Sequence, residues 1–580
     1  MRLLKRSLTL ALLAAGSAFA GSAQAAAVLP LSHSGRWLTD ATGRVLVVHG
    51  INMVYKLPPY YPAAIGFDAD DAAFLKSIGF DAVRVGVIWK AVEPQPGAYD
   101  DAYLRHIADT VRTLAREGIV SLLDFHQDQY NERFQGEGFP DWSVQDDGLP
   151  AEPKEGFGAD YVAMPALSHA FDHFWANSPG PGGIGLQDRY AGAWAHVASW
   201  FKDDPHVLGY ELMNEPWPGS SWPSCGQTQG CPTFDTGPFA AFYRRVIGAI
   251  RGVDPRTLIW YEPQVLFNYG SDTNLPRLGD PHLGFAFHNY CLAHDFAHTT
   301  NGCQQFDDLV FQHALSRVAS TGDALLETEF GATTDPAILT PDVQRSDRDM
   351  VSWLEWHYCG CMDPTTSGPG SEQAIVLDPR KPPVGANLNL PTLRQLVEPY
   401  PQLIAGTPQR WGFDSTTRTF SFQYSANRAR GEPTEVAVPR LVYPHGGAAR
   451  VSGGAIVSKP AADVLQIVAC AGSVSVTVTP TGSDHTSCRA RLAVRVEPSR
   501  ARLRRATTFH ISVTVTLGAY SAPIQGASLF FGQRHATTDA AGRATIRVTL
   551  HRHIRRYGVL ARAEGFTSGE GFIGISNGTG

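Results

Sequence analysis

Residues 208–216 read Leu-Gly-Tyr-Glu-Leu-Met-Asn-Glu-Pro, a short apolar run that ends in polar residues and a proline. Apolar runs of this length, bounded by turn-forming residues, are typical of strands that are buried on both faces. Glu211 and Glu215 would cost free energy in such surroundings unless each has a partner or a function. The stretch therefore predicts a buried parallel strand with acidic groups at its carboxyl end.

Seven further runs of this kind lie between residues 26 and 400, with helix-like segments between them. The clearest segment, Asp101–Glu117, repeats apolar residues with the period of a helix. Eight strand–helix units predict an α/β fold, a (β/α)8 or TIM barrel. The expected strands are Val45–Asn52, Ala82–Val87, Ile119–Phe125, Leu208–Met213, Thr257–Tyr261, Leu283–His288, Ala324–Glu329 and Val351–His357.

A long connection, residues 130–187, follows the third expected strand and is rich in Gly, Pro and aromatic residues. Long connections in compact domains are usually functional, and those after barrel strands lie on the catalytic face. We expect this one to wall a cleft, and the alternative is an insertion without a function.

The domain organisation changes near residue 405, where polar and apolar residues begin to alternate with the period of a strand. A chain of 580 residues exceeds the size of a single core, so several domains are expected. We assign residues 26–405 to the barrel, 406–488 to a β-sandwich and 489–580 to an immunoglobulin- or transthyretin-like β-domain.

Residues 1–25 have the features of a secretory signal peptide: a positive start, an apolar stretch and a small-residue cleavage site. An uncleaved membrane anchor is the alternative, although the apolar stretch is shorter than the roughly 20 residues that a span needs. We therefore expect a secreted or cell-surface protein.

The eight cysteines of an exported chain are expected to form disulfides. Metal binding is the rival use, but no paired Cys-x-x-Cys or His-x-x-x-His spacing accompanies them. We expect neither a metal nor another cofactor. Among the many possible pairings, the short-range ones are Cys225–Cys231, Cys291–Cys303, Cys359–Cys361 and Cys470–Cys488.

The net charge of −7 hides an asymmetry between the domains. Residues 489–580 contain 14 Arg, no Lys and four acidic residues, which gives +10 and leaves −17 for the rest of the chain. A basic domain of this kind predicts an anionic membrane or envelope surface as a partner. A merely solvated basic face is the alternative, and we expect no nucleic-acid partner.

A second acidic stretch, Leu325-Leu326-Glu327-Thr328-Glu329-Phe330-Gly331, ends the seventh expected strand. Glycoside hydrolysis requires two carboxyl groups that flank one bond, and a barrel presents such groups at the carboxyl ends of its strands. Because side chains alternate along a strand, Glu327 should share a face with Glu329. We expect Glu215 and Glu329 to be the catalytic pair, with Glu211 and Glu327 in supporting positions.

The Asn214-Glu215-Pro216 motif, together with polar residues at other expected strand ends, resembles clan A glycoside hydrolases and specifically glycoside hydrolase family five. The supporting residues are Arg84, His126, His288, Tyr290 and Trp356. Each alone has an ordinary structural explanation, whereas together and in this order they match the family.

The resemblance implies a role for each of these residues. Glu215 would be the acid/base, with a pKa raised by burial and by Glu329. Glu329 would be the nucleophile of a retaining mechanism, kept ionised by Arg84 and Tyr290. Further implied roles are a 2-hydroxyl contact for Asn214, hydroxyl or carboxylate contacts for His126 and His288, and an apolar sugar platform for Trp356.

Residues 52–56 and 124–130, with parts of the sandwich, resemble the endoglycoceramidase and glucosylceramidase-like branch over about residues 31–480. That branch implies sugar contacts for Lys56 and Asp128 and a stacking role for Trp175. It also implies cleavage between a glycan and ceramide, and a glycolipid substrate. The basic third domain departs from the usual two-domain layout of the branch.

Three functions are therefore weighed. A glycolipid glycosidase would need an apolar cleft, for which the long connection offers Phe134, Phe139, Trp142 and Phe157. A polysaccharide endo-glycanase or steryl β-glucosidase would share the mechanism. A carbohydrate-binding protein without activity is the third possibility, but it would have no physical need for both carboxylates.

Overall fold

The computed structural model describes residues 27–359, 361, 365, 373–429 and 431–576. The expected signal peptide lies outside these residues. Within the described part of the chain, no helix combines the length and the apolar character that crossing a bilayer requires.

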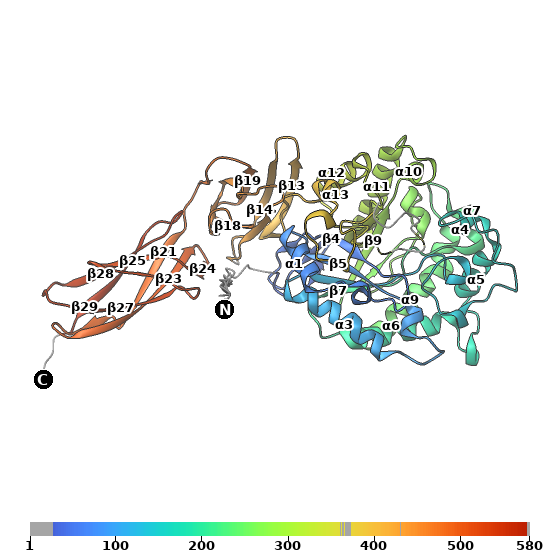
Figure 1. The fold of residues 1–580 in the computed structure, drawn as a ribbon, viewed down its shortest axis with the longest axis horizontal. Helices are drawn as coiled ribbons and strands as arrows, with labels where there is room; N and C mark the ends of the chain where they lie inside the picture. The colour runs from blue at the N-terminus through green and yellow to red at the C-terminus, as the bar shows by residue number, and fades with distance from the viewer. Residues whose placement is uncertain (1–26, 360, 362–364, 366–372, 430, 577–580) are drawn as a thin grey trace, which may run out of the picture.

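Eight parallel strands close into a barrel in the order β4 to β11, which confirms the expected fold class (Figure 1). Seven of the eight predicted runs hold one barrel strand each. Their bounds are β4 His49–Met53, β5 Ala82–Val87, β6 Val120–Phe125, β7 Val207–Glu211, β8 Ile259–Tyr261, β9 Leu283–Asn289, β10 Ala324–Phe330 and β11 Trp353–Glu355.

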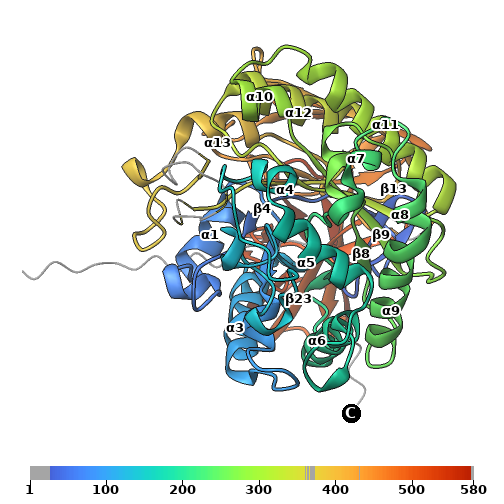
Figure 2. The same cartoon turned by 90° about the vertical axis from the view of Figure 1, so that its right-hand side faces the viewer.

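The helices surround the barrel (Figure 2). The clearest helical segment expected from the sequence, Asp101–Glu117, corresponds to α3. The helices are α1 Ala69–Ser77, α2 Trp89–Val92, α3 Asp101–Arg116, α4 Ala159–Ala163, α5 Pro165–Trp175, α6 Leu186–Phe201, α7 Trp222–Cys225, α8 Pro232–Phe234, α9 Ala240–Arg251, α10 Leu292–Ala297, α11 Cys303–Thr321, α12 Pro336–Asp349 and α13 Leu390–Leu396.

The remaining run, Val45–Asn52, is not a single strand. Its first part is β3 (Val45–Leu46), which joins β1 (Ser32–Ser34) and β2 (Trp37–Thr39) in a sheet with strands of the second domain. Only its later residues form β4 of the barrel. The assignment of residues 26–405 wholly to the barrel was therefore wrong at its amino-terminal end.

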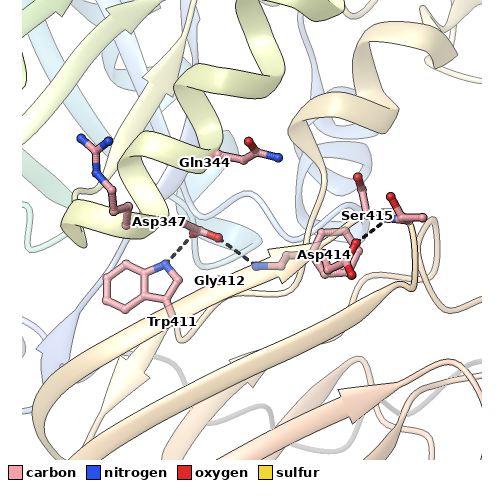
Figure 3. A pocket seen from close by; sticks show the side chains of 9 residues that line it. Gln344, Asp347, Trp411, Gly412, Asp414 and Ser415 are labelled. Atoms are coloured by element: carbon pink, nitrogen blue, oxygen red, sulfur yellow. Dashed lines mark hydrogen bonds between the residues drawn. The ribbon is translucent and has the colours of Figure 1, made fainter. Parts of the chain in front are cut away.

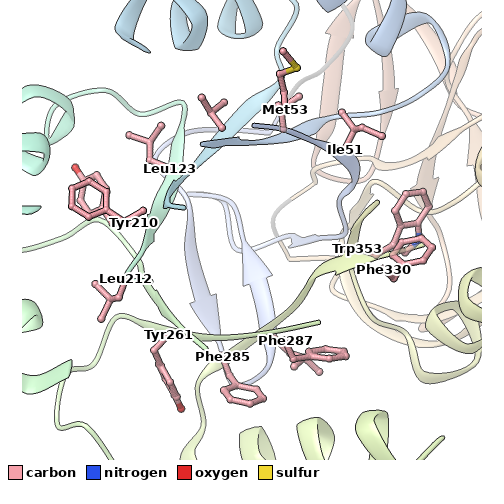
Figure 4. Close-up of a cluster of buried hydrophobic side chains, with 14 of the residues drawn as sticks. Ile51, Met53, Leu123, Tyr210, Leu212, Tyr261, Phe285, Phe287, Phe330 and Trp353 are labelled. Carbon is pink, nitrogen blue, oxygen red and sulfur yellow. The ribbon is translucent and has the colours of Figure 1, made fainter. Parts of the chain in front are cut away.

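Side chains alternate along the strands between the helices and the barrel interior. Leu122, for example, belongs to an inner apolar layer, whereas Leu123 faces the helices. Figure 4 shows the outward set, including Ile51, Phe285 and Trp353, which packs against the surrounding helices. The inner apolar layer fills the amino-terminal half of the barrel, so polar groups near its carboxyl end rest on a packed floor.

The second domain is a sandwich of two sheets. One is the seven-stranded sheet β1-β2-β3-β12-β15-β18-β17, and the other is the five-stranded sheet β13-β14-β19-β16-β20. The bounds are β12 Leu403–Ile404, β13 Gly406–Asp414, β14 Thr419–Ala426, β15 Thr434–Ala437, β16 Ala448–Ser452, β17 Gly454–Ile456, β18 Val464–Ala469, β19 Ser473–Thr479 and β20 His485–Thr486.

The sandwich packs on the amino-terminal side of the barrel. Tyr400 donates a hydrogen bond of 2.7 Å to the carbonyl of Gly79, just before β5. Asp347, at the end of α12, accepts hydrogen bonds from the indole of Trp411 (2.6 Å) and from the amide of Phe413 (3.1 Å) (Figure 3). These contacts line a cavity between α12 and β13, so this cavity lies away from the carboxyl ends of the strands.

The third domain has its own core and consists of two sheets of antiparallel strands with one parallel pair, β22–β29. It extends from the sandwich at the end remote from the barrel (Figure 1). The strands are β21 Arg491–Glu497, β22 Arg500–Ala501, β23 Ala506–Leu517, β24 Tyr520–Pro523, β25 Ser528–Phe531, β26 Arg534–Thr537, β27 Arg543–Thr549, β28 Arg556–Arg562 and β29 Gly569–Ile575.

All four expected disulfides are formed: Cys225–Cys231, Cys291–Cys303, Cys359–Cys361 and Cys470–Cys488. Three of them lie in segments that follow barrel strands, and the fourth joins the residue after β18 to the segment after β20 in the sandwich. The cysteines are therefore structural, as expected from their number.

Candidate active site

The centre of the site is Arg84, a fully buried side chain on β5. Its guanidinium donates to Glu211, Glu329 and Asn214, the last at 2.9 Å. Asp124 and Glu262 complete its surroundings at 3.1 and 3.3 Å. Burial alone would lower the pKa of Arg84, but these carboxylates outweigh it and raise the pKa well above its usual value.

Glu215 lies four residues beyond the end of β7, in the left-handed backbone region with φ of 43°. Two contacts fix this segment to its neighbours. The side-chain amide of Gln127 donates to the backbone carbonyls of Asn214 and Glu215 at 2.8 and 3.1 Å. The Glu215 amide in turn donates to Glu262 at 3.1 Å. The backbone that presents Glu215 is therefore held from both β6 and β8.

Glu329 points into the barrel because β10 carries a bulge. The pairing of β10 with β9 shifts register between Glu327 and Glu329. Thr328 and Glu329 both turn inward, toward Glu211 and Arg84 respectively. Glu327 turns outward and accepts a hydrogen bond of 2.8 Å from Ser346 on α12. The expectation that Glu327 shares a face with Glu329 was therefore wrong, since a bulge breaks the alternation.

His288 on β9 lies between the two carboxyl groups. Its Nδ1 is 2.9 Å from Glu215 Oε1 and 3.5 Å from Glu329 Oε2. The nearest atoms of this trio all lie within 4.8 Å of one another. Burial lowers the pKa of His288 to about 4, so the ring is neutral at neutral pH. A neutral ring can donate one hydrogen bond here without adding a charge.

The two carboxyl groups have different electrostatic surroundings. Burial raises the pKa of Glu215 to about 8, and the negative charge of Asp128 acts in the same direction. The raised pKa agrees with the expectation, although the negative neighbour is Asp128 rather than Glu329. Glu329 accepts hydrogen bonds from Arg84 and, at 2.9 Å, from the hydroxyl of Tyr290.

A second polar cluster adjoins the first. Lys56 forms an ion pair with Asp128, and its ammonium lies 4.4 Å from the ring centre of Trp356. His126 is 2.7 Å from Asp124 and stacks on Trp356. Burial and Lys56 act to lower the pKa of His126, but Asp124 opposes them and the result is a pKa of about 8. Four predicted sugar-binding residues are thus brought together.

Trp175 is placed differently from the other predicted site residues. It ends α5, is 7% exposed and donates its indole N–H to the carbonyl of Trp217 at 2.8 Å. Its ring packs edge-on against Phe234, Phe239 and Phe242. This aromatic cluster accounts for the burial of Trp175 without a sugar, so the structure gives its stacking role no support.

Two of the four aromatic residues proposed to line an apolar cleft are core residues. Phe134 and Phe139 are buried in the barrel domain's core, where Phe139 stacks on Tyr130. That proposal was wrong for both. The long connection is also not irregular throughout, because it contains α4 and α5.

Two residues of the site were missed in the sequence. Glu262 directly follows β8 and contacts Arg84 and the Glu215 amide. Asn268 donates a hydrogen bond of 2.6 Å to Glu215 Oε1. The position of Glu262 after an expected strand was a usable signal. Asn268 lies in a short helical turn, Val265–Tyr269, and has no such signal.

The arrangement suits proton transfer combined with nucleophilic attack. Oε1 of Glu215 is held by Asn268 and His288, whereas Oε2 has no hydrogen-bond partner among the described residues. Glu215 can therefore present a proton on Oε2, close to the oxygens of Glu329 that Arg84 and Tyr290 hold in place. The trio of Glu215, His288 and Glu329 has donor types that also bind metals, but Arg84 already supplies the positive charge beside Glu329.

Comparisons with known proteins agree with this geometry. A family model described as cellulase (glycosyl hydrolase family 5) matches residues 39–362, and the glycoside hydrolase family 5 C-terminal domain matches residues 399–479. Endoglycoceramidase I of Rhodococcus hoagii (strain 103S) is 33% identical over 470 residues, or 79% of this chain and 89% of that protein.

Solved structures give the same result. Endo-glycoceramidase II from Rhodococcus sp., in complex with a five-membered iminocyclitol, has a TM-score of 0.64 at 30% identity and covers 77% of this chain and 100% of its own. Its complex with ganglioside GM3 has a TM-score of 0.62 at 29% identity, with coverages of 77% and 99%. The resemblance to family five is thus confirmed: the chain belongs to glycoside hydrolase family 5 and is a glycosidase.

Proposed function

We propose that this enzyme hydrolyses the β-glycosidic bond of a glycolipid between its glycan and ceramide, with retention of configuration. The observation that carries the mechanism is the approach of Glu215 and Glu329, whose nearest oxygens lie within 4.8 Å. Retaining enzymes hold their carboxyl groups about 5–5.5 Å apart, and inverting enzymes about 6.5–9.5 Å.

In the first step, the carboxylate of Glu329 attacks the anomeric carbon and forms an ester with it. The bond from this carbon to the leaving oxygen breaks, and that oxygen takes the proton of Glu215. The raised pKa of Glu215, about 8, keeps this proton available at neutral pH. Asn214 directly precedes Glu215, and its side-chain oxygen accepts a hydrogen bond from Arg84; we assign it the contact with the sugar's 2-hydroxyl.

In the second step, water attacks the anomeric carbon and Glu215, now a carboxylate, takes a proton from it. The ester bond to Glu329 breaks, and the released carboxylate returns to its contacts with Arg84 and Tyr290. Both steps thus use the same two carboxyl groups. Between the steps Glu215 changes from acid to base, and Glu329 changes from nucleophile to leaving group. Two inversions at one carbon give overall retention.

The glycolipid substrate is supported by two observations. One similar protein is an endoglycoceramidase, and a similar solved structure is that of an endo-glycoceramidase in complex with a ganglioside. In this chain, α4 and α10 belong to the segments that follow the carboxyl ends of β6 and β9, and each exposes a large apolar side chain, Val162 (49%) and Leu292 (50%). Apolar groups at the rim of a polar cleft would suit a lipid leaving group.

The polar cluster around Lys56 completes the proposed sugar site. Lys56 and Asp128 form a buried ion pair that also receives a hydrogen bond from Thr365, at 2.8 Å to Asp128. His126 lies 3.6 Å from the same carboxylate. Groups with fixed donors and acceptors of this kind can bind sugar hydroxyls in one orientation.

A paired assay tests the substrate. Purified enzyme is incubated with a ganglioside in detergent micelles and, separately, with a soluble β-glucan. Release of intact oligosaccharide and ceramide, with little glucan cleavage, is expected. Cleavage of the glucan without cleavage of the ganglioside would instead assign the enzyme to the endo-glycanases.

We also propose that residues 1–25 direct export and that residues 489–580 bind an anionic surface. The first is supported by the composition of the segment, and the second by the excess of ten positive charges. Sequencing the amino terminus of the mature protein from a culture supernatant tests export, with cleavage after Ala25 expected.

A further inference from the structure

Half of the arginines in the third domain gather at one end of it. We define the basic tip as residues 499–505 and 550–556, the loops that flank the start of β23 and join β27 to β28. The two loops are tied together by the Arg504 amide, which donates to the carbonyl of Leu550 at 2.8 Å. The tip contains seven exposed arginines and no acidic residue: Arg500, Arg502, Arg504, Arg505, Arg552, Arg555 and Arg556.

The tip is a formed surface. The hydroxyl of Tyr557 accepts from the Arg552 amide at 2.9 Å and donates to the carbonyl of the same residue at 2.6 Å. The loop closed in this way exposes Ile554 (42%) among the arginines. In the described part of the third domain, Arg495 forms an ion pair with Glu497, whereas no arginine of the tip forms an ion pair.

The tip and the catalytic cleft lie at opposite ends of the molecule. Leu517, at one end of β23, adjoins β24 on the sandwich side, where Lys459 contacts Gln525. The tip lies at the other end of β23, about 36 Å further for 12 extended residues. The sandwich in turn packs on the amino-terminal side of the barrel, whereas α4, α5 and α7 follow the carboxyl ends of the strands, at the far right of Figure 1.

We propose that the basic tip binds an anionic phospholipid bilayer that is not the surface on which the substrate resides. Seven exposed guanidinium groups, none of them in an ion pair among the described residues, fit lipid phosphates, although that of Arg556 also lies over the ring of Phe572. The exposed Ile554 can enter the interface between them. An enzyme bound in this way holds its cleft away from the bound bilayer. It therefore reaches glycolipids that arrive on another surface, which deepens the proposed glycolipid hydrolysis and depends on it.

Vesicle binding tests the surface. Full-length enzyme is sedimented with phosphatidylglycerol/phosphatidylcholine vesicles and with pure phosphatidylcholine vesicles. We expect at least roughly tenfold tighter binding to the anionic vesicles, weakened by high salt, because basic residues near a negatively charged surface are attracted to it and salt screens that attraction. Equal binding to both vesicles would overturn the proposal.

Matched variants locate the binding. Arg552→Glu/Arg555→Glu should abolish the preference for anionic vesicles, and Ile554→Ser should weaken binding several-fold. The control Arg543→Glu/Arg562→Glu makes the same charge change at the other end of the domain and should retain most of the binding. Equal losses of vesicle binding in both double variants would contradict a bilayer site at the tip. Unchanged vesicle binding by Ile554→Ser, in an enzyme that also binds a soluble polyanion, would contradict it as well.

The orientation is tested by separating the two surfaces. A glycolipid without sialic acid, such as lactosylceramide, is placed either in the anionic vesicles that bind the enzyme or in separate neutral vesicles, because a ganglioside would make the second vesicles anionic as well. We expect hydrolysis in the neutral vesicles to be at least as fast, and hydrolysis confined to the enzyme's own vesicle would overturn the proposed orientation. Ganglioside in detergent micelles is the reference: no cleavage there refutes the proposed substrate, whatever the vesicles show.

Discussion

Arginine has opposite surroundings at the two ends of this molecule. In the barrel, a single buried Arg84 is surrounded by four carboxyl groups, Asp124, Glu211, Glu262 and Glu329. At the basic tip, seven exposed arginines have no acidic neighbour within the tip. The buried arginine lies inside a closed network, whereas the exposed ones leave their charge directed outward.

The difference separates two uses of charge. A buried charge must be paired, and its partners then acquire defined protonation states. Burial and the neighbouring charge of Glu211 raise the pKa of Glu262 well above its usual value, although Arg84 acts in the opposite direction. An exposed charge is screened and free, so it contributes long-range attraction and little structure. We therefore expect Arg84 to serve the chemical reaction, and the arginines of the basic tip to determine where the enzyme binds.

The largest effect is expected from breaking the buried network at its nucleophile. Glu329→Gln removes the attacking carboxylate and should lower kcat/KM on a ganglioside by roughly 10⁴-fold or more, as for other covalent catalysts. Steady-state kinetics in detergent micelles measures it. Glu327→Gln is the matched control two residues away, at a carboxyl that faces α12 and accepts a hydrogen bond from Ser346 rather than facing the site. Comparable losses in both variants would contradict the assignment.

The acid/base is expected to give the next largest effect. Glu215→Gln should lower turnover of ganglioside by about 10²–10⁴-fold because the leaving oxygen then departs without a proton. A glycosyl fluoride needs no such proton, so formation of its glycosyl-enzyme should be much less affected. Pre-steady-state measurement with both substrates separates the two. An equal loss on both would mean that Glu215 does not act as the acid.

The pH dependence sharpens the comparison further. Glu215 must be protonated to act, so kcat/KM should be high below its pKa of about 8 and fall as the pH rises through that value. Asp128→Asn removes a negative charge that raises this pKa, while Lys56 remains. The alkaline limb of the kcat/KM profile should therefore move to lower pH. A limb that stays in place, or moves upward, would refute this account of the pKa.

The smallest effect is expected where barrel and sandwich meet. Asp347→Ala leaves the Trp411 indole and the Phe413 amide without their acceptor and should lower the free energy of unfolding by about 1–3 kcal/mol. Thermal unfolding at constant pH measures the change. The control Gln344→Ala alters an exposed residue of the same cavity and should be nearly neutral. Equal effects would show that the hydrogen bonds of Asp347 contribute little.

Much of the barrel could be predicted because buried parallel strands are apolar throughout. The run Ala82–Val87, for example, is β5 without a change at either end. The split of residues 45–52 between two sheets could not be predicted in this way. β3 and β4 follow each other closely and both are buried, and only their partners, β12 and β5, distinguish them.

The site was predictable to the extent that strand ends identify it. Residues at or after strand ends, such as His126, Tyr290 and Trp356, were identified from their position together with the family resemblance. The direction of Glu327 was not, because the bulge that reverses it depends on pairing with β9. Asn268 escaped for a similar reason, since only the folded chain brings its turn to Glu215. Phe134 and Phe139 were misplaced because aromatic residues of a long connection can pack into the core as readily as line a cleft.

The most direct test of the central claim is covalent trapping of the nucleophile. A 2-fluoro glycosyl fluoride of the substrate's sugar slows both steps but slows the second more, so the glycosyl-enzyme accumulates. Mass spectrometry of the digested protein should find one sugar on the peptide that contains Glu329, and none in Glu329→Gln. A label on Glu215 or Glu327, or no label in an enzyme that cleaves ganglioside, would contradict the account.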